Sequence, residues 1–349
     1  MNLPVKPTIL ENVTLSPFTT IKIGGPAKFF CTVISVEELI SAIDWAQTNT
    51  VKFIVLGGGS SVVISDDGFD GLVIKMGIRG QEILNSGPDG IFIKSYAGEI
   101  WDDFVKYTVE NNWAGVECLS SIPGTVGAAP IQNIGAYGQE VKDTITEVEV
   151  LNTLNLQIEK LSNTQCGFTY RNSVFKQKPG KIVVSITFKL IPEGEPTLKY
   201  KPLQDAFGGK IPSLKEVRNE VIQIRKSKSM VIDPKDLNSV SVGSFFINPI
   251  IDHKKLEKLK KKQGNAIPSW KTENGTYKLA AAWLIEQSGF NKGYSYKNVG
   301  ISQNHALALI NKGKGNSKEL LDLANQIMSK VKSDFGVKLE IEPQLLGFE

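Results

Sequence analysis

Two loops rich in small residues are the strongest candidates for chemistry in this chain. VLGGGSS occupies residues 55–61, and SSIPGTVGAAPIQNIGAYGQE occupies residues 120–140, where Glu140 is the one ionised side chain. Glycine lets a ligand approach the backbone closely, and Pro123 and Pro130 fix φ, so the second loop is expected to have a defined shape. Either loop alone is more often a tight turn. Together they favour a ligand of dinucleotide size, held in part by backbone amides.

The first loop departs from the common nucleotide-binding motifs. After Gly57 and Gly59, the third glycine position of the dinucleotide fingerprint is Val62, and the VVIS that follows is typical of a strand where the fingerprint needs a helix. No G-x-x-x-x-G-K-[ST] occurs, which argues against an ordinary P-loop ATPase. A strand, a Gly-Ser turn and another strand remain.

Few residues are suited to metal or triad chemistry. His253 and His305 are the only histidines, which excludes a histidine-rich metal site and leaves little for a Ser-His-Asp triad. Cys31, Cys118 and Cys166 lack metal or redox spacing, so they are predicted to be buried thiols. We therefore expect no metal, and if the protein is an enzyme, other groups or a cofactor carry its chemistry.

Composition indicates a globular protein of about two domains. The chain has 349 residues, 41% of them hydrophobic and 22% charged, with a net charge of +4. Its apolar runs are too short for a membrane helix, and its start does not resemble a signal peptide, so we expect a cytoplasmic protein. The basic run 253–264 is predicted to be the solvated face of a helix and does not indicate a nucleic acid partner. No pattern marks an assembly interface, and a monomer is expected.

The elements that must position the loops mix helices and strands up to about residue 190. Helices are predicted over 36–49 and 100–112. In the predicted strand 182–190, the alternating residues are expected to share one face: Ile182, Val184, Ile186, Phe188 and Leu190. The other predicted strands cover residues 51–56, 62–65, 72–76 and 91–97.

A boundary rich in proline and glycine follows near 195–213, and a small α+β unit is predicted beyond it. A long helix should start at Ser317 and carry an apolar stripe, and the alternation of 337–342 predicts a strand. Further elements are predicted at 214–228 and 278–289 (helices) and at 305–311 (strand). The stripe comprises Leu320, Ala324, Ile327, Val331 and Phe335, and the inner face of the last strand comprises Val337, Leu339 and Ile341.

Seven stretches lie between residues 19 and 348: TTIKIGGPA, VLGGGSSVVISDDGFDGLVI, AGEIWDDFVKYTVENNWAGVECLSSIPGTVGAAPIQNIGAYGQE, FTYRNSVF, SVGSFFINP, KLAAAWLIE and LEIEPQLLGF. In this order they resemble the UDP-N-acetylenolpyruvoylglucosamine reductase (MurB) family. PIQNIGAYG and GSFFxNP are highly specific motifs, whereas GGGSS alone is not.

This resemblance implies an α+β fold with an FAD-binding domain of the vanillyl-alcohol oxidase (PCMH) type. That domain would span 1–200 as two α+β subdomains, completed by a C-terminal strand at 337–349. A second, smaller α+β domain at 213–336 would bind substrate. The implied reaction is the NADPH-dependent reduction of UDP-N-acetylglucosamine enolpyruvate to UDP-N-acetylmuramate in peptidoglycan precursor synthesis. Hydride would pass from NADPH to FAD N5 and then to substrate C3, with a proton added at C2.

The resemblance also implies the residues that hold the ligands. The pyrophosphate of FAD would meet Gly57, Gly58, Gly59, Ser60 and Ser61, and the rest of the cofactor would lie along Ser121, Pro123, Gly124, Gly127 and Ile131. The nucleotide-sugar would meet Tyr200, Lys228, Asn248, Lys278, Lys292 and His305. A tyrosine at position 200 matches members with a substrate-covering loop.

Three residues match the family's catalytic positions: Arg171, Ser244 and Glu342. Addition of hydride at C3 places negative charge on C2 and the adjoining carboxylate, which the planar fork of Arg171 would pair with. Ser244 would give the proton to C2, although a serine is a weak acid and needs help from a neighbour. The alternation of apolar and charged residues in 337–342 makes Glu340 as good a candidate for the third catalytic position as Glu342. The match of Leu346-Gly347 to the family motif selects Glu342.

Two other functions remain open from the sequence. A sugar oxidase of the same flavin fold would pass electrons to oxygen, and a UDP-sugar transferase or binder would use the loops for its diphosphate. Bound flavin would exclude the transferase or binder, and bleaching of the flavin by NADPH would exclude the oxidase.

Overall fold

The computed structural model describes residues 6–177, 180–263, 267–272 and 274–348. Its internal contacts divide the chain into two compact units. The first unit comprises Met1–Val13, Ala27–Gly59 and Phe69–Ser227, and the second comprises Thr14–Pro26, Ser60–Gly68 and Lys228–Glu349. Each unit is therefore built from segments that are far apart in the sequence.

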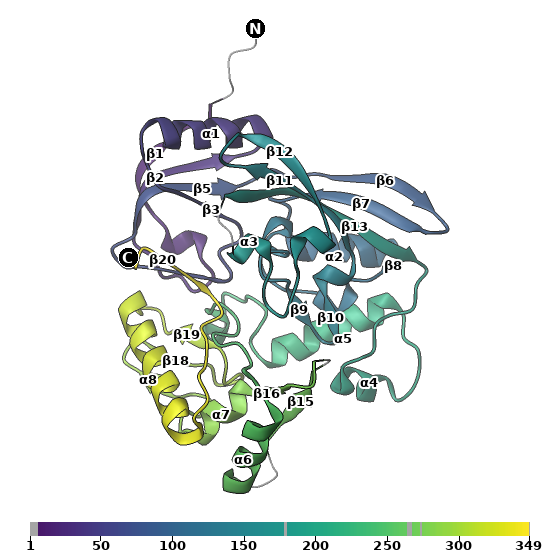
Figure 1. Cartoon of the computed structure of the whole chain (residues 1–349), viewed down its shortest axis with the longest axis vertical. Coiled ribbons are helices and arrows are strands. Elements are labelled where there is room, and N and C mark those ends of the chain that lie inside the picture. Colours follow the sequence, from purple (N-terminus) through teal and green to yellow (C-terminus); the bar gives the residue numbers. More distant parts are fainter. Residues whose placement is uncertain (1–5, 178–179, 264–266, 273, 349) are drawn as a thin grey trace. The chain divides into compact units, whose positions relative to one another are not determined.

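The first unit contains a sheet covered by one helix, α1 (Figure 1). The helix begins at Ser35, whose side chain accepts the N–H of Glu38 at 3.1 Å, which is the geometry of an N-cap. Its apolar face packs on the parallel strands β2, β5 and β3, so α1 connects two strands that point the same way. The bounds are β1 Leu10–Thr14, β2 Pro26–Val33, α1 Val36–Thr48, β3 Phe53–Leu56 and β5 Phe69–Met76.

A larger antiparallel sheet, in the order β12-β11-β13-β7-β6, forms the rest of this unit's framework. Helix α2 packs on it through Phe104, whose ring lies 4.6 Å from that of Phe188 between centroids. The strands are β6 Gln81–Gly87, β7 Gly90–Tyr96, β8 Trp113–Ala114, β11 Ile145–Asn152, β12 Gln157–Ser162 and β13 Lys181–Pro192, and α2 spans Trp101–Glu110. The predicted helices and strands of this region are confirmed within a few residues.

The prediction that five residues of β13 share one face is wrong. Val184 packs in the cluster beneath α1, whereas Ile186 and Phe188 pack in the cluster beneath α2. The register against β11 shifts between Glu149 and Val150, and such a bulge turns the residues on either side of it to opposite faces.

Short elements complete the first unit. Helices α4 and α5 bury Leu203, Val217 and Val221 together with Cys118. The elements are α3 Val174–Gln177, α4 Lys201–Phe207, α5 Leu214–Ser227, β9 Gly135–Ala136, β10 Gln139–Glu140, and the 3-10 helices Glu117–Leu119, Val126–Ala128, Val141–Asp143 and Thr164–Cys166.

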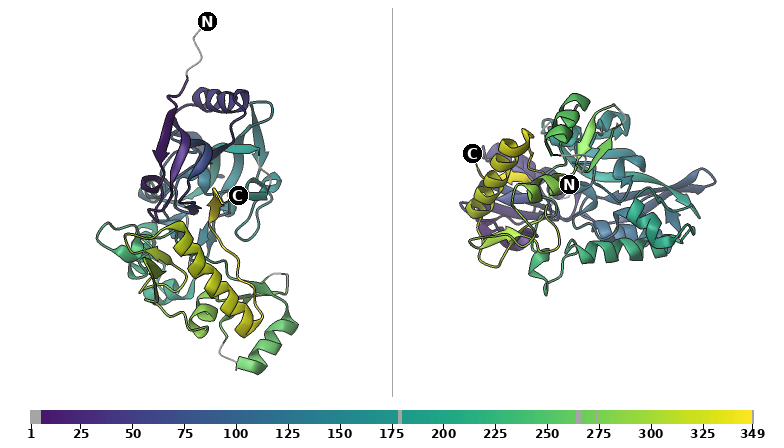
Figure 2. Two further views of the ribbon diagram at one scale, coloured as in Figure 1. Left: turned by 90° about the vertical axis from the view of Figure 1, so that its left-hand side faces the viewer. Right: turned by 90° about the horizontal axis from the view of Figure 1, so that it is seen from below.

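The second unit is built around the long helix α8, which packs along β18 and α7 (Figure 2). Asn316 caps its start by accepting the N–H of Glu319 at 2.8 Å, and Gly336 ends it with φ +63°. The predicted start at Ser317 and its buried stripe are confirmed. The elements are β4 Val62–Ile64, β14 Ile250–Ile251, α6 His253–Gln263, β15 Ser269–Lys271, β16 Tyr277–Leu279, α7 Ala281–Gln287, β17 Ser295–Tyr296, β18 Val299–Ile301, β19 Leu309–Asn311, α8 Ser317–Phe335, β20 Gln344–Leu346, and the 3-10 helices Ser16–Phe18 and Leu237–Ser239.

Two strand predictions in this unit need correction. The segment 337–342 is not a strand: Val337 and Leu339 are buried as expected, but the segment's backbone pairing is the isolated bridge between Ile341 and Phe246. The strand expected over 305–311 is limited to β19, because a turn occupies its first residues. Alternation thus identified the buried side chains correctly without identifying the backbone pairing.

Two simpler expectations were met. The basic run lies on α6, with Leu256 and Leu259 buried and most of its lysines toward solvent. The cysteines are buried thiols, and burial raises the pKa of Cys166 to about 11. None of the helices in the described part of the chain is long and apolar enough to cross a membrane.

Candidate functional site

The two glycine loops of the first unit pack backbone against backbone. A Cβ on Gly58 would lie 2.5 Å from the Cα of Gly124, and a Cβ on Gly57 would lie 2.7 Å from Oγ1 of Thr125. Real Cβ atoms essentially never approach that closely, so both positions require glycine. Gly124 also has φ +135°, a conformation that side chains rarely adopt. The loops between β3 and β4 and after α2 therefore present bare backbone at the same place.

Polar groups at this junction suit an anionic ligand. The Thr125 hydroxyl oxygen is buried without a hydrogen-bond partner among the described residues, which is rare in native proteins unless a ligand or water supplies one. Lys75 on β5 donates its ammonium to the carbonyl of Gly57. Burial and the neighbouring charge of Arg79 lower the pKa of Lys75, so a negative group here would relieve an unfavourable environment. The residues present thus fit the diphosphate of a dinucleotide.

The second loop is tied to the framework at both ends of its glycine-rich part. A Cβ on Gly127 would lie 2.4 Å from the Cβ of Ala97, and the N–H of Gly127 donates to the Ala97 carbonyl at 2.9 Å. The carbonyl of Ile131 accepts the hydroxyl of Ser173 at 2.7 Å. These contacts fix the stretch that is expected to lie along the cofactor.

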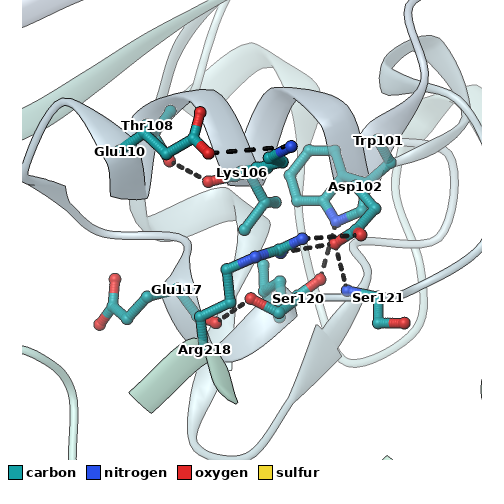
Figure 3. Close-up of polar contacts among 11 residues, drawn as sticks. Trp101, Asp102, Lys106, Thr108, Glu110, Glu117, Ser120, Ser121 and Arg218 are labelled. Atoms are coloured by element: carbon teal, nitrogen blue, oxygen red, sulfur yellow. Dashed lines mark hydrogen bonds and ion pairs between the residues drawn. The ribbon is translucent and has the colours of Figure 1, made fainter. Parts of the chain in front are cut away.

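The first turn of α2 holds the preceding part of this loop (Figure 3). Trp101 donates its backbone N–H to Gly124 at 3.1 Å and its indole N–H to Leu119 at 2.9 Å. The backbone N–H of Ser121 donates to the Asp102 carboxylate. Ser121 has φ +60°, so the carboxylate stabilises a backbone conformation that costs energy for a residue other than glycine.

Arg218 of α5 completes this arrangement. Its two terminal nitrogens donate to the two oxygens of Asp102 at 2.7 and 2.9 Å, a bidentate pair. Burial alone would raise the pKa of Asp102, but hydrogen bonds from Arg218 and Ser121, and the charges of Arg218 and Arg225, hold it below the ordinary carboxyl value. Asp102 is therefore a carboxylate at neutral pH. Sequence reasoning did not identify this pair, whose members are 116 residues apart.

Arg171 lies in a turn whose strained backbone, φ +54°, aims its guanidinium at the second loop. Its Nη2 donates to the Gly135 carbonyl at 2.6 Å, and its Cζ lies 5.2 Å from the centre of the Tyr170 ring. Asn133, which is fully buried, supports the same turn by donating to the Thr169 carbonyl at 3.1 Å. The plane of the guanidinium is thus fixed, as recognition of a carboxylate requires.

Tyr200, at the start of α4, packs its ring edge-on against Tyr137, with 5.3 Å between centroids. Burial raises the pKa of Tyr137, whose hydroxyl interacts with Arg225. Arg225 is buried at the end of the α5 stripe that includes Val217 and Val221. A cation in an apolar stripe was the sequence signal that could have identified Arg225, and the sequence reasoning did not use it.

In the second unit, the structure brings the segments of Ser244 and Glu342 together. The N–H of Glu342 donates to the Phe245 carbonyl at 2.9 Å, and the N–H of Phe245 donates to Leu307 at 2.8 Å. Gly243, with φ +77°, makes the turn that precedes Ser244. Backbone hydrogen bonds therefore hold both candidate catalytic residues in adjacent segments of one unit.

The remaining predicted substrate residues of this unit are spread over several elements. The side-chain oxygen of Asn248 accepts the N–H of Ala281 at 2.9 Å and so caps α7, and Lys278 lies on the neighbouring strand β16. Lys292 is exposed in a turn, and His305 is partly buried in another. Lys228 is partly buried before Ser229, and Ser60 is also partly buried. The carbonyl of Ser61 accepts the N–H of Gln344 at 3.0 Å.

No cluster of three or more His, Cys, Asp or Glu residues that could hold a metal ion occurs within residues 6–177, 180–263, 267–272 and 274–348.

Comparisons with known proteins agree with this organisation. Residues 27–155 match the family model of an FAD binding domain, and residues 233–346 match that of the C-terminal domain of UDP-N-acetylenolpyruvoylglucosamine reductase. The UDP-N-acetylenolpyruvoylglucosamine reductase of Salinispora arenicola is 40% identical, covering 95% of this chain and 94% of its own. That of Thermobifida fusca is 38% identical, covering 97% and 98%.

A solved structure shows the same fold. The crystal structure of UDP-N-acetylenolpyruvylglucosamine reductase (MurB) from Thermus caldophilus superposes with a TM-score of 0.66 at 24% identity, covering 97% of this chain and 98% of its own. The predicted α+β fold with an FAD-binding domain is confirmed.

Proposed function

The chain belongs to the UDP-N-acetylenolpyruvoylglucosamine reductase (MurB) family, and we propose that it reduces the enolpyruvyl ether of UDP-N-acetylglucosamine enolpyruvate to UDP-N-acetylmuramate. The observation that carries this proposal is the junction of the two glycine loops, where Gly58 meets Gly124 beside the unpartnered Thr125 hydroxyl. The bare backbone of this junction can accommodate a flat or phosphorylated ligand. The junction lies within residues 27–155, which match the family model of an FAD binding domain. The reaction serves peptidoglycan precursor synthesis.

Bound FAD would supply the redox chemistry, taking hydride from NADPH and delivering it to C3 of the enolpyruvyl group. The chain's own task at the loops is to hold the cofactor. The amides of Gly57, Gly58 and Gly59, with the hydroxyls of Ser60 and Ser61, would meet the diphosphate, and Lys75 would offset part of its charge. Ser121, Pro123, Gly124, Gly127 and Ile131 would line the remainder of the cofactor.

Three residues would manage charge and protons on the substrate. Arg171 would pair with the carboxylate, which becomes more electron-rich as hydride adds at C3. Ser244 would donate its hydroxyl proton to C2. Glu342, whose backbone is hydrogen-bonded to Phe245, would assist from the adjoining segment.

We propose further that residues 1–200 with 337–349 form the cofactor-binding part and residues 213–336 the substrate-binding part. The two family matches, 27–155 and 233–346, support this order along the chain. Tyr200, Lys228, Asn248, Lys278, Lys292 and His305 would contact the nucleotide-sugar. The enzyme would act in the cytoplasm on two water-soluble substrates. It would also be a monomer, which analytical ultracentrifugation would check.

The visible spectrum of the purified protein tests the function. We expect oxidised-flavin bands that bleach anaerobically with NADPH and return on addition of UDP-N-acetylglucosamine enolpyruvate. Oxidised-flavin bands that NADPH does not bleach would instead favour the sugar oxidase. A colourless protein that also fails to take up FAD would favour a UDP-sugar transferase or binder.

A further inference from the structure

Glu117 is a buried acid that has no part in the reaction described above. It is 0% exposed, in the short helix before the second glycine loop. Its Oε2 accepts the N–H of Gly115 at 2.7 Å, and its Oε1 accepts the amide of Gln139 at 2.7 Å and the N–H of Thr197 at 2.8 Å. In Figure 3 its carboxylate points away from Arg218. A buried carboxylate is costly unless such donors surround it, so these partners are required.

Thr197 connects Glu117 to the segment that leads into Tyr200. The hydroxyl of Thr197 accepts the side-chain amide of Gln139 at 3.0 Å, and its carbonyl accepts the thiol of Cys118 at 3.2 Å. Its backbone N–H is held by Glu117, so Thr197 is anchored through three different atoms. Tyr200 follows three residues later.

The rest of this segment lies on the turn at Tyr137 and Gly138, directly before Gln139. A Cβ on Gly138 would lie 2.7 Å from the Cβ of Lys199, so glycine is needed for this close approach. Tyr200 packs against Tyr137 from the same turn. The segment 197–200 therefore follows the turn 137–139 closely.

The hairpin that contains this turn also positions Arg171, whose guanidinium donates to the carbonyl of Gly135 on β9 at 2.6 Å. In this small hairpin of β9 and β10, Gln139 pairs with Ala136 and Glu140 pairs with Gly135. One short hairpin thus supports Arg171 on one strand and, through Gln139 and Glu117, the Tyr200 segment on the other.

We propose that Glu117 is a positioning residue for substrate binding, anchoring the Tyr200 segment to the hairpin that orients Arg171. Tyr200 and Arg171 then meet the nucleotide-sugar from a single rigid support. This inference rests on the proposed function, which gives Tyr200 and Arg171 their roles toward the substrate.

Glu117→Gln is the direct test, because the amide that replaces one carboxylate oxygen would face an N–H donor. We expect the KM for UDP-N-acetylglucosamine enolpyruvate to rise about tenfold. The rate of flavin reduction by NADPH and the affinity for FAD should stay within about twofold of the parent, because neither step uses the Tyr200 segment. Glu195→Gln is the matched control: it makes the same chemical change on an exposed carboxyl of the same segment and should alter nothing.

A double variant separates positioning from general stability. In a Tyr200→Ala background, Glu117→Gln should raise KM little further, because the residue it acts through is gone. The proposal is wrong if the increase in KM of the double variant equals the product of the two single increases. It is also wrong if Glu117→Gln lowers FAD affinity as much as it lowers substrate binding. Should Glu117→Gln fail to fold, Thr197→Val removes only the hydroxyl contact with Gln139 and should raise KM about threefold; an unchanged KM would then count against the proposal.

Failure of the proposed function itself would look different. The parent protein would then not reoxidise with the enolpyruvyl substrate, whatever the variants do. Limited proteolysis would still test whether Glu117 anchors the Tyr200 segment in that case. The Glu117→Gln protein should be cleaved faster within residues 193–212 than the parent protein or the Glu195→Gln protein. Equal cleavage of all three proteins would show that Glu117 does not anchor the segment.

Discussion

The two units hold their candidate site residues in different ways. In the first unit, side chains make the ties: Asp102 accepts the N–H of Ser121, and Arg171 donates to Gly135. In the second unit, backbone hydrogen bonds hold the candidate residues: Glu342 donates its N–H to the carbonyl of Phe245. A side chain can be exchanged where the backbone does the positioning, whereas a loop held by side chains moves when one is lost. Substitution of Ser244 in the second unit should therefore alter a rate, whereas substitutions at Gly58 and Asp102, which shape or hold the glycine loops of the first unit, should alter cofactor affinity.

Ser244→Ala should give the largest effect and the cleanest one. Its neighbour Phe245 is held by backbone hydrogen bonds to Leu307 and Glu342, so the fold should be unchanged. Loss of the proposed proton donor should slow flavin reoxidation by the enolpyruvyl substrate roughly 10²- to 10⁴-fold. Anaerobic stopped-flow absorbance would measure this step, with NADPH-driven reduction and Tm as controls. Equal loss of both half-reactions would reject the assigned role.

Gly58→Ala probes the first unit where its two loops touch. The added methyl group would lie 2.5 Å from the Cα of Gly124 and must push the loops apart. Overpacking of this kind costs about 2 kcal/mol, equivalent to about a thirtyfold loss of FAD affinity if the strain falls on the holo form. Fluorescence titration of the apoprotein with FAD would measure it. Gly87→Ala, where no atom lies within 4 Å, is the control; a Gly58→Ala protein that binds FAD normally would refute the contact.

The sequence predicted the site's local parts better than their connections. The glycine loops, the start of α8 and the motif around Ser244 are visible locally because glycine spacing, caps and apolar stripes act over a few residues. The contact of Glu117 with Thr197 spans 80 residues, and that of Asp102 with Arg218 spans 116. No periodicity encodes such pairs, because they depend on how the elements pack.

The errors at the level of elements have a similar cause. The segment containing Val337 and Leu339 alternates like a strand and buries the expected side chains. It nevertheless lacks a continuous partner strand, and the pairing with β4 begins only at Gln344. Alternation reports burial, while a strand needs a partner that the local sequence does not specify.

Arg171→Lys should have a smaller effect than the loss of Ser244 and should test whether geometry matters as well as charge. Lysine keeps the positive charge but replaces the planar fork with a single point donor. We expect flavin reoxidation to slow about tenfold, the value of one lost charged hydrogen bond, with NADPH-driven reduction unaffected. Stopped-flow measurement over a range of substrate concentrations would separate affinity from rate. A lysine variant as fast as the parent would show that charge alone suffices.

Asp102→Asn should give the smallest effect and one that depends on pH. The amide can still accept from Ser121 but no longer pairs two oxygens with Arg218, so FAD affinity should fall about fivefold at pH 7. The pKa of Asp102 in the folded protein lies below its ordinary value of 3.8. The ionised Asp102 therefore contributes its full stabilisation of the fold above pH 3.8, and this contribution is lost as the pH falls through the folded-state pKa. The difference in FAD affinity between the two proteins should therefore shrink as the pH falls through the folded-state pKa of Asp102, which lies below 3.8. Asp103→Asn, on the exposed side of the same helical turn, is the matched control. A pH-independent difference in FAD affinity would mean that Asp102 does not act on the loop through its charge.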